Sequence, residues 1–196
     1  MAVEVEVENI TKYHKGTEPQ VFLTRQYKSQ PALPIRGGWG YSEADAVVID
    51  RHHPSAANFQ PFNGVEIEHI FARLRMYEEL IGCRPEGKQH LGCQLKLKKQ
   101  SLRGGEAGKK YDVMEFDITA LPLEVWEALK AEWEGPNGFR SPDFDQEDHI
   151  RRRDAATVHY VGEYWFEISS FFGKSDDDDQ DDDPPVKFPA MPAPVM

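Results

Sequence analysis

Three segments of the chain alternate apolar and polar residues with the period of two that is typical of half-buried strands. Residues 2–8, AVEVEVE, place valines on one face and glutamates on the other. Residues 91–103 and 110–120 alternate in the same way, and the connection between them contains three glycines. These two segments therefore predict a β-hairpin joined by a flexible turn.

Other stretches predict strands without strict alternation. Residues 46–49, AVVI, are apolar on both faces, which indicates a strand in the interior of a sheet. Residues 20–28, QVFLTRQYK, are also predicted as a strand. Residues 156–172 contain alternating aromatic residues and predict a final strand that breaks near Gly162. Loops are predicted where proline, glycine and polar residues gather, in residues 30–45, 52–64 and 138–149.

Two segments repeat apolar residues at the spacing of one helix face. Residues 122–134, PLEVWEALKAEWE, carry such a stripe and are followed by Gly-Pro, a pair that ends helices. Residues 66–81 carry a second stripe, and Asn63 precedes it by three residues, as a helix cap would. Both segments are predicted as helices. For the second one a long edge strand is the alternative, because GVEIEH at its start alternates.

These elements predict a single α+β domain over residues 1–173, in which one or two helices pack on a mostly antiparallel sheet of about five to seven strands. Residues 174–196 have a different composition, with seven aspartates and a proline-rich end. Runs of aspartate repel themselves, and the segment offers little apolar surface to bury. It is therefore predicted to be a disordered acidic and proline-rich tail.

The composition indicates a soluble globular protein, with 39% hydrophobic and 29% charged residues. No apolar run is long enough to cross a bilayer, so no membrane contact is expected. Residues 1–15 lack a basic start followed by an apolar block, which predicts no secretory signal. Cys83 and Cys93 are then expected to be thiols in a cytoplasmic protein.

The formal net charge of −11 is divided between the tail, at −5, and residues 1–173, at −6. An acidic body repels bulk DNA unless it carries a local basic patch. The same charge favours rapid capture of a basic partner.

The first candidate site is a possible metal centre at the end of the AVVI strand. Asp50, His52 and His53 follow this strand, and Glu68 and His69 come later in the chain. Such nitrogen and oxygen ligands can hold a divalent metal that activates water for hydrolysis, as in a nuclease. Their spacing matches no established metal motif, so a polar loop is the alternative and no cofactor is expected.

The second candidate site is a surface for single-stranded nucleic acid. Trp39 and Tyr41 lie in the glycine-rich stretch RGGWGYSEAD and can stack on bases. Lys96 and Lys98 belong to a basic stripe on the predicted hairpin. The alternatives are that Trp39 covers the core and that the lysines form a solvated strand face.

The two cysteines and the acidic tail are the remaining candidate functional residues. A catalytic cysteine needs a histidine beside it in space, and Cys93 is expected on the inward face of its strand. The tail is predicted either to bind a partner or to keep the protein soluble. If it binds, its first acidic residues are Asp176, Asp177, Asp178 and Asp179.

No enzyme motif stands out in the chain. The leading hypothesis is therefore a non-catalytic protein-binding module, such as an inhibitor, immunity factor, adaptor or accessory subunit, that uses its acidic surface to bind another protein with a basic surface. A metal-dependent hydrolase and a single-stranded nucleic-acid-binding protein are the alternatives.

Overall fold

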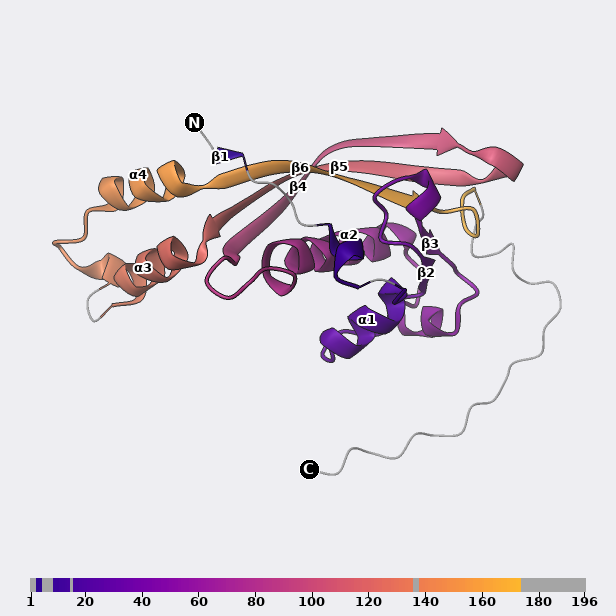
Figure 1. Cartoon of the computed structure of the whole chain (residues 1–196), viewed down its shortest axis with the longest axis horizontal. Helices are drawn as coiled ribbons and strands as arrows, with labels where there is room; N and C mark the ends of the chain where they lie inside the picture. The colour runs from indigo at the N-terminus through magenta and orange to yellow at the C-terminus, as the bar shows by residue number, and fades with distance from the viewer. Residues whose placement is uncertain (1–2, 5–8, 15, 136–137, 174–196) are drawn as a thin grey trace, which may run out of the picture.

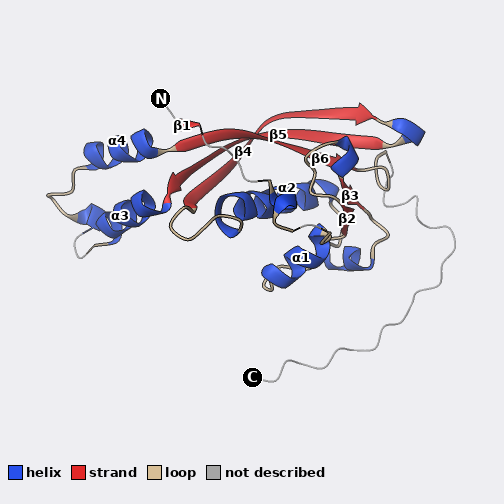
Figure 2. Ribbon diagram, viewed as in Figure 1, coloured by secondary structure: helices blue, strands red, loops and turns tan. Residues whose placement is uncertain are grey.

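The computed structural model describes residues 3–4, 9–14, 16–135 and 138–173. Within them the chain forms one α+β domain around a mostly antiparallel mixed sheet (Figure 1 and Figure 2). Five strands follow one another across the sheet. Their order is β2 (Ile35–Gly37), β3 (Val47–Ile49), β6 (Val158–Glu167), β5 (Lys110–Pro122) and β4 (His90–Gly104).

The strand β6 organises the sheet because both of its edges are paired. β5 runs antiparallel along its whole length on one edge. The other edge is shared by β1 (Val3–Glu4), parallel at Val158 and His159, and by β3, parallel at Phe166 and Glu167. The long antiparallel partner of β5 is β4, which forms an outer strand of the sheet.

In the described residues four α-helices accompany the sheet, in two pairs, where one or two were predicted. α1 (Pro19–Gln26) and α2 (Gly64–Tyr77) lie on one side of the sheet, whereas α3 (Leu123–Glu134) and α4 (Gln146–Ala156) extend beyond its end (Figure 1). Short 3-10 turns span Ile10–Lys12, Glu43–Asp45, Pro54–Asn58, Glu106–Gly108 and Gly138–Arg140. In the part of the chain that the structure describes, no helix is both long and apolar enough to span a membrane.

The main core lies between α2 and the sheet. Phe71 of α2 packs edge-on against Phe166 of β6, with ring centroids 5.8 Å apart. Phe116 of β5 is also buried in this core. Burial of one such side chain contributes about 1.5–3 kcal/mol. The start of α2 is capped by the Asn63 side chain, which accepts a hydrogen bond from the Glu66 backbone N–H at 3.2 Å.

The structure confirms the predicted fold class and several of its elements. The hairpin, the interior strand at Val47–Ile49 and the helices at residues 66–81 and 122–134 are all present. Asn63 caps the first of these helices as predicted. These elements were predictable because each has a complete periodic pattern with its own start or stop signal.

Other predictions were wrong. The segment predicted as a strand at residues 20–28 is mostly helix, because Pro19 starts α1 and the helix buries Leu23 in the core. The predicted loop at residues 30–45 contains β2, and the predicted loop at 138–149 already includes the start of α4. β6 continues through Gly162, which pairs with Phe116 of β5. Of the predicted strand at 2–8, residues 2 and 5–8 lie outside the described part of the chain, as does the predicted tail.

Candidate functional site

The most distinctive surface of the protein is the helical arm, which we define as residues 123–135 and 138–156. It consists of α3, α4 and the described part of the connection between them, and it projects from the end of the sheet (Figure 1). α4 begins where the Asp145 side chain accepts a hydrogen bond from the Asp148 backbone N–H at 2.9 Å. Each helix buries only one residue, Leu129 in α3 and His149 in α4. The arm therefore leaves much of its apolar surface uncovered.

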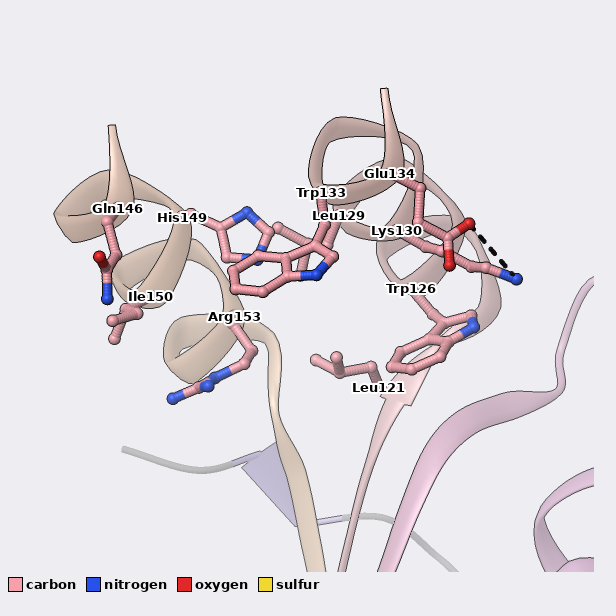
Figure 3. Close-up of a pocket in the computed structure, with 10 residues that line it drawn as sticks. All are labelled: Leu121, Trp126, Leu129, Lys130, Trp133, Glu134, Gln146, His149, Ile150 and Arg153. Carbon is pink, nitrogen blue, oxygen red and sulfur yellow. Dashed lines mark ion pairs between the residues drawn. The ribbon is translucent and has the colours of Figure 1, made fainter. Parts of the chain in front are cut away.

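A cleft of about 390 Å³ lies between the two helices (Figure 3). In Figure 3, Trp133 lies beside His149 of the facing helix, and Trp126 lies near Leu121. The apolar part of the lining consists of Leu121, Trp126, Leu129, Trp133 and Ile150. A second cleft of about 450 Å³ opens between α3 and α4, and Leu129 lines both. The helices are thus in contact at few points, with open space on either side of Leu129.

A cluster of aromatic rings surrounds Trp133, one of the residues that line the first cleft. Trp133 stacks on Phe139 with ring centroids 4.7 Å apart, and it meets the edge of Phe144 at 5.8 Å. Trp133 is nevertheless 44% exposed, Phe139 49% and Ile150 37%. Single exposed apolar residues are common on soluble proteins, but a cluster of large ones marks a surface that binds something.

Ion pairs hold the two helices of the arm together. Arg152 of α4 reaches both carboxylate oxygens of Glu132 on α3, at 2.8 and 2.5 Å, and Nδ1 of His149 lies 3.4 Å from the same carboxylate. The hydrogen bond from Arg152 holds the pKa of Glu132 below its usual value. Within α3, Lys130 and Glu134 of the cleft lining pair with each other at 3.9 Å (Figure 3).

The arm as a whole is acidic. Its sequence contains nine carboxylates and five lysine or arginine side chains, a formal charge of −4. Comparison of the chain with protein-family models, curated proteins and solved structures found no match.

The predicted metal ligands at the end of β3 make local hydrogen bonds. Asp50 accepts a hydrogen bond from the His52 backbone N–H at 3.0 Å and pairs with Arg36 at 3.4 Å. Nδ1 of His53 accepts a hydrogen bond from the Ser55 backbone N–H at 3.1 Å, and so caps the turn that follows. These contacts are those of a strand end that enters a polar loop.

The two other predicted ligands lie on α2. Glu68 is buried, and the ring of His69 meets the edge of Phe116 with centroids 5.7 Å apart. In the described ranges, a single group of three potential ligand side chains lies with its donor atoms within 4.8 Å of one another, and none of the five predicted ligands belongs to it. That group consists of His14, Glu78 and Cys83.

The two aromatic residues of the predicted stacking surface point into the protein. Trp39 is buried and packs against Phe71, with ring centroids 6.2 Å apart. The Tyr41 hydroxyl donates a hydrogen bond to Glu79 at 2.8 Å, and the Arg75 guanidinium lies 3.7 Å from the centre of its ring. Both residues therefore help to build the core in this structure.

The predicted basic stripe lies on β4, opposite carboxylates of β5. Lys96 pairs with Asp117 in the strand register, and Lys98 approaches the same carboxylate at 3.9 Å. Lys99 pairs with Glu115 at 3.5 Å. Carboxylates of the neighbouring strand thus offset part of the positive charge that would attract a phosphate backbone.

Cys93 is half-buried, and burial raises the pKa of its thiol to about 11. A thiol of this kind is mostly protonated at neutral pH, which makes it a poor nucleophile. The predicted tail residues Asp176 to Asp179 lie outside the described part of the chain.

The cleft residues were not among the predicted site residues. The stripe of Leu123, Trp126, Leu129 and Trp133 is visible in the sequence, where it predicts the face of a helix packed on the sheet. A prediction of α4 would have indicated the site, because a second helix opposite this stripe forms a cleft with it. The sequence does not predict that helix, because residues 146–156 are mostly polar and have no apolar periodicity.

Proposed function

We propose that this protein is a non-catalytic protein-binding module whose helical arm holds an apolar segment of a basic partner protein. The observation that carries the proposal is the exposure of Trp133 and Ile150, which line an open cleft, and of Phe139, which stacks on Trp133. Aromatic side chains are enriched in protein interfaces, and buried tryptophans are among the few residues that contribute most of the binding energy. A partner that covers them would bury surface that the fold leaves in water.

The chemistry of the partner follows from the size of the cleft and the charge around it. About 390 Å³ lies near the lower end of the range for ligand pockets, roughly 300–1,000 Å³. It suits one or two anchoring side chains better than a whole helix. The formal charge of −4 on the arm and of −11 on the chain favours a partner with basic residues beside the anchor.

An inhibitor, an immunity factor, an adaptor or an accessory subunit would each use a surface of this kind. We propose the cytoplasm as the place of action. Cys83 and Cys93 are both thiols, as is usual in a reducing compartment.

The direct test replaces Ile150 at the cleft with a photo-reactive amino acid and irradiates the protein in its native host. The matched control carries the same group in place of Val161, an exposed apolar residue of β6. We expect one basic protein to be crosslinked from position 150 and not from position 161. Equal crosslinking from both positions would count against the arm as the binding surface.

The partner found in this way is then titrated against purified variants. Trp133→Ala and Phe139→Ala should each weaken binding at least about tenfold, which is the scale of an interface hot spot. Phe172→Ala, at an exposed phenylalanine outside the arm, should leave the affinity unchanged. If the crosslinked protein is a second copy of this chain, the arm is a dimer interface and the proposal of a different partner is wrong.

A further inference from the structure

We propose that His14, Glu78 and Cys83 form a binding site for a zinc ion, which would tie the turn at His14 to the end of α2. The donor atoms of these three side chains lie within 4.8 Å of one another. Glu78 is only 2% exposed and Cys83 only 6%, so the cluster is not a chance group of surface residues. The site is independent of the helical arm and of any partner that the arm binds.

A π-helix brings two of the three ligands together. Residues Glu78–Gly82 continue α2 as a π-helix, and the Cys83 backbone N–H donates a hydrogen bond to the Glu78 carbonyl at 2.9 Å. In an α-helix, residues five apart point about 140° away from each other. The wider π turn places Glu78 and Cys83 on the same side of the helix. π turns are rare and recur at functional sites.

The residue at position 82 also fits this arrangement. A Cβ atom added to Gly82 would collide with the carboxylate of Glu78. Glycine therefore leaves room for that carboxylate to fold back over the helix end toward Cys83. Any larger residue at this position would displace one ligand of the proposed site.

The third ligand comes from a distant part of the chain. His14 is 69 residues from Cys83, and its Nε2 lies 3.7 Å from the Cys83 Sγ atom. Its ring is held against Phe22, with centroids 4.0 Å apart. A tetrahedral zinc ion with usual Zn–S and Zn–N bonds separates these two atoms by about 3.6 Å. The imidazole and the thiol are thus already at the spacing that zinc needs.

The carboxylate is oriented by a neighbour, as ligands of zinc usually are. The Tyr27 hydroxyl donates a hydrogen bond to Oε1 of Glu78 at 2.7 Å and so fixes the orientation of this carboxylate. Three protein ligands leave the fourth position of zinc to a water molecule. The thiol would lose its proton on binding, and a thiolate with an imidazole favours zinc over magnesium or calcium.

The test starts from the reduced full-length protein, freed of metal with a chelator. Calorimetric titration with zinc should give one site per chain, and zinc should raise the melting temperature by several degrees while magnesium should not. Cys83→Ser and His14→Ala should lose both effects. Cys93→Ser and His52→Ala are the matched controls and should keep them. The proposal is overturned if zinc does not raise the melting temperature, or if Cys83→Ser binds zinc as the wild-type protein does.

A measurement on the wild-type protein covers the case in which Cys83→Ser fails to fold. Alkylation of each thiol by iodoacetamide is followed by mass spectrometry with and without zinc. Zinc should slow the modification of Cys83 at least tenfold and leave the rate at Cys93 unchanged. Equal rates at Cys83 in both conditions would show that zinc does not bind there.

Discussion

Glu68 shows how burial changes the chemistry of a single residue. It lies on α2 with 1% of its surface exposed, and its Oε2 atom makes no hydrogen bond within the described part of the chain. Asp112 of β5 is also buried, and only its other carboxylate oxygen accepts a hydrogen bond, from Gln100. Burial, and then the nearby Asp112, raise the pKa of Glu68 to about 8, and burial raises the pKa of Asp112 as well. Glu68 is therefore protonated in the folded protein at neutral pH.

The first prediction follows from this raised pKa. The folded state holds the Glu68 proton more tightly than the unfolded state does, so stability is lost as pH rises from about 4.3 to about 8. The free energy of unfolding should fall by about 1.4 kcal/mol per pH unit in this window, and Asp112 adds to the fall. Glu68→Gln should remove most of this slope and stabilise the protein at pH 8 by about 5 kcal/mol, which is the slope multiplied by the width of the window. Denaturant unfolding of the wild-type protein and of Glu68→Gln, from pH 5 to pH 9, measures the free energy of unfolding and its slope with pH.

Glu66→Gln is the control for this experiment, because Glu66 is an exposed residue of the same helix. It should leave the pH dependence unchanged. A Glu68→Gln protein with the wild-type slope would show that Glu68 is ionised in the folded state.

The second prediction concerns the buried ion pair of Arg75 and Glu79. Their side chains meet at 2.8 Å and are almost completely buried, and Tyr160 also donates a hydrogen bond to Glu79 at 3.1 Å. Removal of one partner leaves the other charge buried without compensation, which typically costs about 3–5 kcal/mol. Arg75→Met should lower the free energy of unfolding by this amount. Arg73→Met, at an exposed arginine of the same helix, should change it by less than about 0.5 kcal/mol.

At the scale of the elements, α3 and α4 differ from the rest of the fold. α2 is stabilised by a buried face against the sheet, whereas each helix of the arm buries a single residue. Isolated helices of this length are only marginally stable in water. The arm therefore depends more than α2 does on its caps and on ion pairs such as Glu132–Arg152.

The third prediction tests this dependence at the cap of α4. Asp145→Ala removes the side chain that accepts the Asp148 amide hydrogen bond, at a cost of about 1 kcal/mol. Hydrogen exchange at the amides of α4 should speed up about fivefold, while exchange in α2 stays unchanged. Asp143→Ala removes a nearby exposed carboxylate that is not the cap, and should have no such effect. Unchanged exchange in Asp145→Ala would mean that other contacts hold α4.

At the scale of the whole molecule, charge is distributed in two ways. On β4 the lysines lie opposite carboxylates of β5, so part of their charge is offset locally. The arm and the segment 176–183 carry an excess of carboxylates. Attraction between opposite charges mainly speeds association, and it is screened beyond about 8 Å at physiological salt.

The fourth prediction rests on the proposed function and concerns the kinetics of binding. Once the basic partner is identified, its association rate with this protein should fall as salt rises, while the dissociation rate changes little. Replacement of the aspartates between residues 176 and 183 by serine and asparagine should slow association several-fold at low salt. The test is to measure association by stopped flow at two salt concentrations, once with the wild-type protein and once with the variant that lacks these aspartates. Equal rates in all four conditions would mean that charge does not guide this encounter.

The sequence by itself determined the elements that have a complete local pattern. The hairpin of β4 and β5, the interior strand β3 and the capped helix α2 each follow from the spacing of apolar residues and a nearby turn or cap signal. These patterns are local, because a strand or a helix places its side chains according to its own period. These local patterns are sufficient to predict the α+β fold class and the mostly antiparallel sheet.

Only the tertiary structure decided where the chemistry lies. Trp39 lies in the core, α4 faces the apolar stripe of α3, and His14 meets Cys83 across 69 residues of chain. None of these has a local signal, since a side chain's neighbours across the core depend on how the whole chain packs. A glycine-flanked tryptophan reads the same in the sequence whether it faces solvent or the core, and only the packing of α2 and the sheet around it distinguishes the two.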